Sequence, residues 1–394
     1  MTDASDHLPL SQGPRVLVYV PHGAIPDRRG FAPAIVAGEF ARRTRSFMPR
    51  LVAAAERDRP GSFNWEGLRL ERLPDRRVYR RLCKLGVRLP GVSLSRDFLR
   101  ICREARPDIV HVHQLEFDVK EFAHRLGRLL PTVVHAHVLS QERCASRGVA
   151  NRYVAVSDYV RSGLADIGYP HDRIVTIHNG VSTRLFAPPG ASQAALAKER
   201  LGVGAETPVL AFVGRKHDIK GYPTFLAVVE RLLERGAPLF ALAIGADPER
   251  PSGEHGFVVS REQEKRLIAS GRFRSLPAMP QSDLAKLYEA IDITLLPSRA
   301  ETQGMAVIES LSSGCVTISA RVGGIPESVV NGVTGFLVDD PRDTDALYEK
   351  TAYVLEHLAE FAPLRSAARA YAVANLDWSV SAARLEVLYE SVLA

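Results

Sequence analysis

The 394-residue chain has few cysteines and no long apolar run. Its four cysteines, Cys83, Cys102, Cys144 and Cys315, are scattered without paired spacing, which argues against a zinc site and a disulfide framework. No window approaches the roughly 18 consecutive apolar residues that mark a membrane-spanning helix. The first residues lack the basic start and apolar core of a secretory signal. We therefore expect a cytoplasmic protein in a reducing compartment.

Two common nucleotide-binding motifs are also missing. The phosphate-binding pattern G-x-x-x-x-G-K-[ST] does not occur. The nearest match to a dinucleotide fingerprint, Gly202-Val-Gly204, precedes an expected strand instead of following one, which argues against a dehydrogenase. A D-x-D triplet at Asp343-Thr-Asp345 stands just before an expected helix, where Asp is a common N-cap, so we interpret it as structural.

Apolar runs alternate with helical patterns along most of the chain, which predicts α/β architecture with parallel sheets. The length of 394 residues exceeds the usual size of one domain, so we expect two. The Pro- and Gly-rich stretch 186–192 is the expected linker. A second α/β series then begins with an expected strand at 209–213.

Charge is distributed unequally between the two halves. Residues 1–185 hold 30 Lys and Arg against 19 Asp and Glu, a net charge of +11, which leaves −5 for residues 186–394. The basic half predicts an anionic partner: lipid head groups, a polyanionic saccharide or nucleic acid. An Arg-rich composition without any such partner is the alternative.

The segment 69–91 concentrates this positive charge. Leu82, Leu85 and Leu89 recur there at helical spacing among arginines, which predicts a basic amphipathic helix from about Asp75. Such a helix could lie on an anionic membrane surface. A solvated helix packed through its leucines fits the pattern slightly better, because surface helices commonly show it.

The segment 297–327 predicts two successive strand-turn-helix units. We expect a short helix that contains Glu309 and ends at Gly314, with Glu301 either in this helix or just before its first turn, and a second helix that starts at Pro326. Helix N-termini carry unpaired N–H groups and partial positive charge, so a phosphate is a natural ligand at both.

A second loop supplies matching positive charge. Arg215 and Lys220 flank a flexible loop after the strand at 209–213, and a forked donor with a mobile point charge suits a diphosphate. Carboxylates accept paired hydrogen bonds from vicinal hydroxyls, so Glu301 and Glu309 suit a hexose and a ribose. Each residue taken alone also fits an ordinary surface position.

Together these residues resemble the signature of the family 4 retaining glycosyltransferases, which have the GT-B fold. Further motifs occur in the family's order along nearly the whole chain. The motifs that carry the resemblance are Asp108–His113, 134–137, 156–160, His178–Val181, 214–221, 297–314 and 322–327.

The resemblance implies a role for each matching residue. Arg215 and Lys220 would hold the donor's diphosphate, Glu309 its ribose and Glu301 the sugar hydroxyls. The other implied donor contacts are Gln303, Gly304, Met305, Gly30 and, beside the base, Met279. His137 would act over the donor sugar, with His135 as the alternative for that register, and His113 and Arg29 would lie on the acceptor side. The family's usual Gly-Gly loop is replaced here by Arg28-Arg29-Gly30.

The resemblance also implies the reaction and the domain boundaries. The expected enzyme moves a hexose from a UDP-, GDP- or dTDP-sugar, with retention and without a metal or other cofactor. Its acceptor would be a saccharide, a lipid-linked molecule or a natural product in cell-envelope synthesis, and nucleic acid is not expected. It would be cytoplasmic or peripheral on the inner face of the plasma membrane. The N-domain would comprise 1–186 plus 377–394, across a cleft from a C-domain of 187–376. A non-catalytic nucleotide-sugar-binding protein is the alternative.

Overall fold

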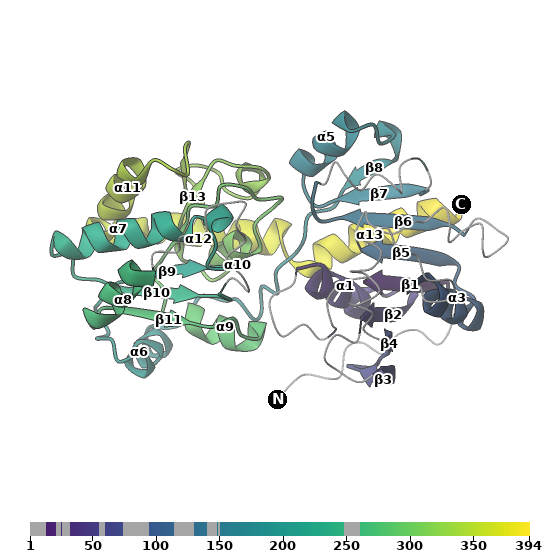
Figure 1. Cartoon of the computed structure of the whole chain (residues 1–394), viewed down its shortest axis with the longest axis horizontal. Coiled ribbons are helices and arrows are strands. Elements are labelled where there is room, and N and C mark those ends of the chain that lie inside the picture. Colours follow the sequence, from purple (N-terminus) through teal and green to yellow (C-terminus); the bar gives the residue numbers. More distant parts are fainter. Residues whose placement is uncertain are drawn as a thin grey trace. The chain divides into compact units, whose positions relative to one another are not determined.

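The computed structural model describes residues 13–20, 25, 32–54, 60–73, 94–113, 130–139, 148, 150–247 and 261–394. The chain forms two compact units, Met1–Asn179 with Trp378–Ala394, and Gly180–Asp377 (Figure 1). None of the described helices combines the length and the apolar character that crossing a membrane requires.

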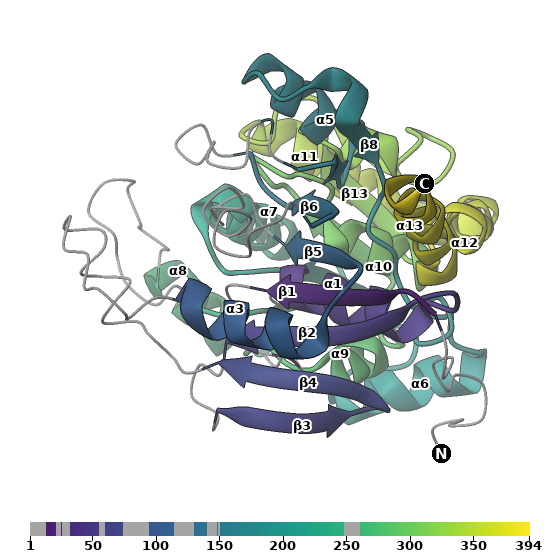
Figure 2. The ribbon, with the colours of Figure 1, turned by 90° about the vertical axis from the view of Figure 1, so that its right-hand side faces the viewer.

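The first unit is built on an eight-stranded sheet in the order β3-β4-β2-β1-β5-β6-β7-β8 (Figure 1 and Figure 2). Its strands are β1 (Arg15–Val20), β2 (Met48–Ala54), β3 (Gly61–Trp65), β4 (Leu68–Leu73), β5 (Ile109–His113), β6 (Thr132–Ala136), β7 (Arg152–Ala155) and β8 (Ile174–Thr176). Its helices are α1 (Ala32–Arg43), α3 (Leu94–Ala105), α5 (Asp158–Asp166) and α13 (Trp378–Leu393), with a 3-10 turn at His171–Arg173.

A hairpin at the edge of this sheet departs from the predicted all-parallel pattern. Strands β3 and β4 pair antiparallel across the two-residue turn Glu66-Gly67, where φ is 51° and 81°. Positive φ at both positions is typical of the tight turns that match strand twist. Arg69 and Arg72 therefore lie on a strand. The amphipathic helix predicted from Asp75 lies outside the described residues.

The second unit contains a six-stranded parallel sheet in the order β11-β10-β9-β12-β13-β14. Its strands are β9 (Val209–Val213), β10 (Phe240–Ile244), β11 (Phe273–Leu276), β12 (Ile293–Leu296), β13 (Val316–Ala320) and β14 (Phe336–Val338). Its helices are α6 (Ala191–Arg200), α7 (Tyr222–Glu234), α8 (Arg261–Ala269), α9 (Gln281–Tyr288), α10 (Met305–Ser312), α11 (Thr344–Glu356) and α12 (Ala362–Asn375), with 3-10 turns at Asp218–Lys220, Ile325–Glu327 and Leu358–Phe361.

Both faces of the second sheet are covered by helices. Along β9, Val209, Ala211 and Val213 belong to one apolar core, and Leu210 and Phe212 belong to another. The first core includes α10 and α12, and the second includes α7 and α11. A strand buried on both faces reads as a continuous apolar run, which is why this strand was predictable from the sequence.

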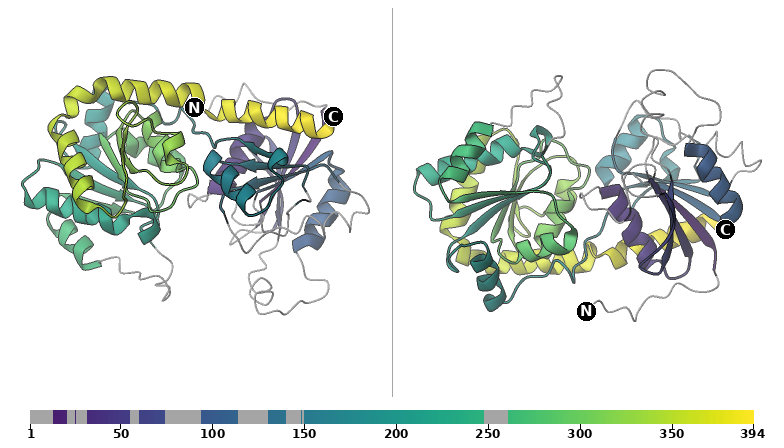
Figure 3. Two further views of the ribbon diagram at one scale, coloured as in Figure 1. Left: turned by 90° about the horizontal axis from the view of Figure 1, so that it is seen from above. Right: turned by 60° about the horizontal axis from the view of Figure 1, so that its bottom comes forward.

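The chain passes between the units earlier than predicted. The predicted linker begins at Phe186, but this ring is buried in the core of the second unit. Its carbonyl oxygen accepts hydrogen bonds from Ser312 Oγ at 2.6 Å and Arg369 Nη1 at 2.9 Å. The units instead divide after Asn179, and the chain returns to the first unit at Trp378, where α13 begins (Figure 3). The ring of Trp378 packs edge-on against Phe40 of α1 at 5.5 Å, so the predicted return of the last helix is confirmed.

Candidate functional site

The strand order of the second unit creates a switch point between β9 and β12. The chain moves outward from β9 through β10 to β11 on one side, and from β12 through β13 to β14 on the other. The loops that follow β9 and β12 therefore leave the sheet in opposite directions. Open parallel sheets bind ligands at such a point, outside the carboxyl ends of the strands.

An ion pair joins these two loops. Lys220 Nζ, from the loop after β9, lies 2.6 Å from Glu301 Oε1, from the loop after β12. Ser298 Oγ donates to the same carboxylate oxygen at 3.1 Å. The side chains of Lys220 and Glu301 are 22% and 15% exposed, so the pair is partly shielded but open to a ligand. The structure thus brings together two residues that lie 81 positions apart in the sequence.

Two glycines allow the loops to approach this closely. At Gly221, φ is 71°, and a Cβ atom would lie 1.9 Å from the carbonyl oxygen of Pro297. At Gly323, φ is 55°, and a Cβ atom would lie 1.7 Å from the carbonyl oxygen of Glu301. Any other residue would meet both a backbone clash and an unfavourable φ. Close packing of backbone therefore fixes the position of Glu301.

The helix after Glu301 begins at Met305. Gly304 is the N-cap of α10, so of the two expected placements of Glu301 the one before the first turn is confirmed. No described side chain caps this end, and its first turn carries no acidic residue. Gln303 is buried, and Met305 is the first helical residue. The N-terminal amides of α10 therefore provide the uncapped positive end that an anion requires.

Glu309 lies one turn after Met305 and is buried at 5% exposure. Gln281 Nε2, from the start of α9, donates to its Oε1 at 3.2 Å. Burial raises the pKa of Glu309 to about 8, and the hydrogen bond from Gln281 only partly offsets this. The side chain is thus mostly a neutral acid at pH 7, able to donate as well as accept a hydrogen bond. Gln281 also ties Glu309 to the loop of Met279, which the sequence did not indicate.

The remaining predictions for this unit have mixed outcomes. Arg215 is exposed and makes no ion pair with the described residues. Asp343 caps α11 by accepting from the amide of Ala346 at 2.9 Å, which confirms its structural interpretation. The predicted helix at Pro326 is wrong, because only a three-residue 3-10 turn forms at Ile325–Glu327. Of the two helix N-termini predicted to bind a phosphate, only the one at α10 is present in the described part of the chain.

In the first unit, four histidines form a cluster on one face of the sheet. His113 of β5 stands directly opposite His135 of β6. His111 precedes His113 by two residues and His137 follows His135 by two, so all four side chains share a face. Exposure is 0% for His111, His113 and His135 and 5% for His137. The sequence predicted His113 and His137 as site residues but not their contact with the other two.

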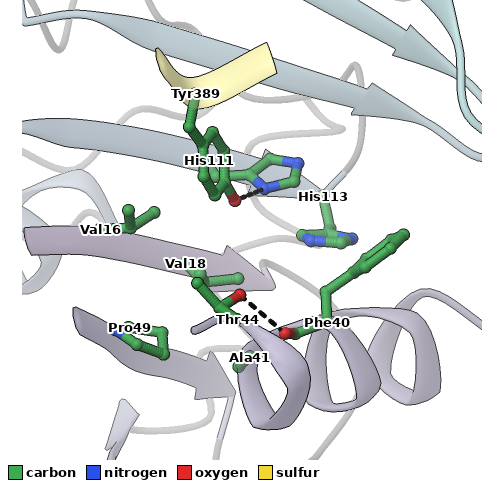
Figure 4. Close-up of a pocket in the computed structure, with 9 residues that line it drawn as sticks. All are labelled: Val16, Val18, Phe40, Ala41, Thr44, Pro49, His111, His113 and Tyr389. Carbon is green, nitrogen blue, oxygen red and sulfur yellow. Dashed lines mark hydrogen bonds between the residues drawn. The ribbon is translucent and has the colours of Figure 1, made fainter. Parts of the chain in front are cut away.

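The imidazole rings are stacked and neutral. Ring centroids are 4.5 Å apart for His111 and His113, and 4.5 Å for His135 and His137. Burial lowers the pKa of His111 and of His137 to about 3, and lowers those of His113 and His135 well below the usual value. Tyr389 Oη of α13 lies 2.6 Å from His111 Nδ1 (Figure 4). A small pocket beside them is too narrow to admit a water molecule.

The cluster is not arranged as a metal centre. Ring nitrogens of His111, His113 and His135 lie within 4.8 Å of one another. The planes of His111 and His135 are only 9° apart, and those of His113 and His135 only 21°. Lone pairs in nearly parallel planes do not converge on one point, whereas a metal ion requires convergence. Gly30 and Arg29, also predicted as site residues, lie outside the described residues.

Family models match both parts of the chain. Residues 27–185 match the model described as Glycosyltransferase Family 4, and residues 194–372 match the one described as Glycosyl transferases group 1. A D-inositol 3-phosphate glycosyltransferase of Corynebacterium diphtheriae is 30% identical over 73% of this chain and 71% of its own. The chain therefore belongs to the glycosyltransferase family 4 proteins of the group 1 type.

Other similar proteins agree with this membership. The D-inositol 3-phosphate glycosyltransferase of Thermobispora bispora is 32% identical to this chain. The match covers 65% of this chain and 59% of that relative. Among solved structures, HepE of Anabaena in complex with UDP-glucose has a TM-score of 0.76 at 18% identity and covers 96% of this chain and 99% of its own. Sucrose-phosphate synthase of Thermosynechococcus elongatus has a TM-score of 0.78 at 18% identity, with the same coverage. These likenesses confirm the predicted GT-B fold.

Three contacts of this glycosyltransferase join a predicted site residue or its neighbour to a residue that was not predicted to lie at the site. They are the hydrogen bond from Ser298 to Glu301, the one from Gln281 to Glu309, and the one between Tyr389 and His111. In each case the partners are distant in sequence or lie in a loop whose path depends on packing. The sequence carried no signal for the pairings of Gln281 and Tyr389. Ser298 stands three residues before Glu301, a spacing that a loop-capping search would have found.

Proposed function

We propose that the protein transfers a hexose-type sugar from a nucleoside diphosphate donor to a hydroxyl acceptor, with retention of anomeric configuration. The observation that carries the proposal is the contact of Lys220 with Glu301 at the switch point of the second sheet. A cation and a sugar-binding carboxylate side by side match a ligand that has a diphosphate next to a sugar. Structures of HepE with UDP-glucose and UDP support the same donor class.

In this proposal each part of the second unit binds one part of the donor. Lys220 leaves Glu301 for the diphosphate, and exposed Arg215 adds a forked contact. Glu301 is then free to accept hydrogen bonds from sugar hydroxyls. The amides at Gly304 and Met305, next to Gln303, face the developing negative charge, and Glu309 holds the ribose while the Met279 loop meets the base. No metal is needed, because two cations and a helix N-terminus neutralise the diphosphate.

The proposed reaction uses no separate strong base in the protein. The leaving diphosphate takes the proton of the acceptor hydroxyl on the face where the new bond forms. The second unit lowers the barrier by holding the charge that grows on the diphosphate. Removal of one such donor costs about 3 kcal/mol in other enzymes. His137 is proposed to donate a hydrogen bond to a substrate oxygen from the first unit.

The acceptor is proposed from charge and from the named relatives. A net charge of +11 on residues 1–185 favours an anionic acceptor. The relatives are named for D-inositol 3-phosphate, which is such a molecule. Lipid-linked saccharides of the cell envelope are the other anionic class, and Arg29 is proposed to contact either one. A neutral saccharide acceptor would contradict the charge argument.

The donor and the stereochemistry can be tested together. Thermal unfolding in the presence of UDP-, GDP- and dTDP-sugars should show a raised Tm for one base, since a ligand stabilises the folded state by RT ln(1+[L]/Kd). That donor should then be consumed with D-inositol 3-phosphate or a lipid-linked saccharide, and NMR of the product should show the donor's anomeric configuration. An inverted product would contradict retention. Binding without turnover on any acceptor would contradict the proposal as a whole and favour a non-catalytic binding protein.

Peripheral membrane association is proposed from the segment 69–91. If its arginines contact lipid, the protein should sediment with vesicles that contain anionic lipid and dissociate as salt is raised, because screening weakens such contacts. Neutral vesicles serve as the control. Equal sedimentation with both kinds of vesicle would show that the charge of the segment has no such role.

A further inference from the structure

His113 cannot contact a substrate directly in this structure, because its exposure is 0%. It does contact His137. His113 Nδ1 lies 3.0 Å from His137 Nε2, and the two ring centroids are 5.2 Å apart with planes 20° from parallel. His137 is the outermost of the four clustered histidines at 5% exposure. The role of His113 must therefore pass through His137.

The hydrogen bond between them contains a single proton. Burial lowers the pKa of both rings well below the usual range, so each is a neutral imidazole with one N–H. Either His113 donates from Nδ1, or His137 donates from Nε2. The two arrangements place the proton of His137 on different nitrogens, since the N–H of a neutral imidazole is set by the bond its other nitrogen makes.

The surroundings of His113 distinguish the two arrangements. Its Nε2 is buried and has no hydrogen-bond partner among the described residues. If His137 donated, His113 would carry its own proton on Nε2, and that N–H would be buried without an acceptor. If His113 donates, Nε2 keeps only a lone pair. Buried N–H groups without a partner are rarer than acceptors without one, so donation by His113 is favoured.

We propose that His113 is a positioning residue for His137: its Nδ1–H donates to His137 Nε2 and holds the proton of His137 on Nδ1, where it can be donated to a substrate oxygen. The proposal rests on the proposed function for its catalytic consequence, but the tautomer of His137 is a property of the free protein. The backbone register supports it, because His113 on β5 faces His135 and so meets His137 across the end of β6. Because each of the two rings is held by its own strand, neither has much freedom to turn away from the other.

The tautomer can be measured directly. Long-range ¹H–¹⁵N NMR on protein with labelled histidine, at neutral pH without ligand, should show His137 as the Nδ1–H form. His113→Phe keeps an aromatic ring in the stack but removes the donor, and should shift His137 toward the Nε2–H form. The matched control is His111→Phe, a substitution on the same strand and face that should leave the tautomer of His137 unchanged. An Nε2–H form in the wild type, or no change in His113→Phe, would overturn the proposal.

Kinetics on two polar variants separate positioning from stability. The amide nitrogen of His113→Asn falls near the former Nδ1, and that of His113→Gln falls near the former Nε2. His113→Asn should keep kcat near wild type, whereas His113→Gln should lower it on the order of 100-fold with the donor KM little changed, because a misplaced catalytic group costs about this much. Equal kcat values in the two variants would contradict positioning.

The outcome is separable from that of the proposed function. If His137→Ala retains full transfer, the catalytic role of His137 fails, yet the NMR result still decides whether His113 sets its tautomer. If His137→Ala is inactive while the tautomer is unaffected by His113→Phe, the proposed function stands and the positioning role fails. Far-UV circular dichroism of each variant confirms that the folded protein is being compared.

Discussion

The first unit places four neutral histidines on one face of its sheet, whereas the second unit places an ion pair and a buried acid beyond the ends of its strands. The histidine rings stack on one another and are almost fully enclosed. Lys220 and Glu301 lie in loops and remain partly exposed. Charged ligand groups therefore have suitable partners in the second unit, while the first unit offers hydrogen bonds from groups that stay uncharged.

The largest expected effect concerns Glu301 in the ion pair of the second unit. Glu301→Ala should lower transfer by roughly 100- to 1,000-fold, since about 3 to 4 kcal/mol of transition-state stabilisation would be lost. Binding of the nucleoside diphosphate should stay nearly intact. Glu301 competes with the diphosphate for Lys220 and does not itself bind the diphosphate. Turnover and calorimetric titration measure the two quantities. Glu234→Ala, at an exposed position on α7, is the control. Unchanged turnover would remove Glu301 from the site.

The first unit, which contains the four neutral histidines, should lose folding stability in acid. The pKa of His111 falls from 6.5 unfolded to about 3 folded, so protonation favours the unfolded chain. Stability is intact above pH 6.5 and is lost as the pH falls toward 3, by up to about 1.4 kcal/mol per pH unit for each histidine. The chain's two tryptophans, Trp65 and Trp378, both belong to the first unit, so their fluorescence reports this loss. A pH-independent midpoint of urea unfolding between 6.5 and 4.5 would contradict it.

Glu309 should respond to pH in the opposite direction. Its pKa of about 8 means that the folded protein holds a proton which the unfolded chain, with a value near 4.5, has released. Stability from this group therefore declines as the pH rises from 4.5 to 8. If ribose hydroxyls donate to the ionised carboxylate, nucleoside diphosphate affinity should instead rise over pH 6 to 8, by up to about tenfold per unit.

Calorimetric titrations of the nucleoside diphosphate over that pH range measure the effect of Glu309. Glu309→Gln is the control, because an amide of the same shape cannot ionise. It should bind with little dependence on pH beyond that of the ligand's own phosphate. The same slope in both proteins would assign the pH dependence to another group.

The sequence predicted the second unit better than the first. Strands such as β9 are buried on both faces and read as continuous apolar runs. The loops of Lys220 and Glu301 were identified by residue type beside glycines. The hairpin β3–β4 was missed because its turn, Glu66-Gly67, lacks the usual Asn or Asp. The linker was placed at Phe186 on composition, which cannot show that its ring is buried.

Site contacts were less predictable than site residues. His113 and His137 were expected from motifs, but their hydrogen bond depends on which residues of β5 and β6 stand opposite each other. Both strands are buried along their whole length, so their apolar pattern does not show which residues stand opposite each other. The contact of Gln281 with Glu309 likewise joins two helices that are separate in the sequence. Residue types can therefore indicate a ligand class, whereas protonation states require the folded neighbours.

The loops of the second unit are proposed to hold a diphosphate through Lys220. The most direct test of this contact is a calorimetric comparison of a nucleoside diphosphate with its nucleoside, on wild type, Lys220→Ala and the control Lys286→Ala, whose side chain is exposed on α9. Lys220→Ala should weaken the diphosphate by roughly 10- to 100-fold, the value of a charge-assisted contact, and leave the nucleoside unchanged. Equal diphosphate affinity in Lys220→Ala and wild type would contradict the claim.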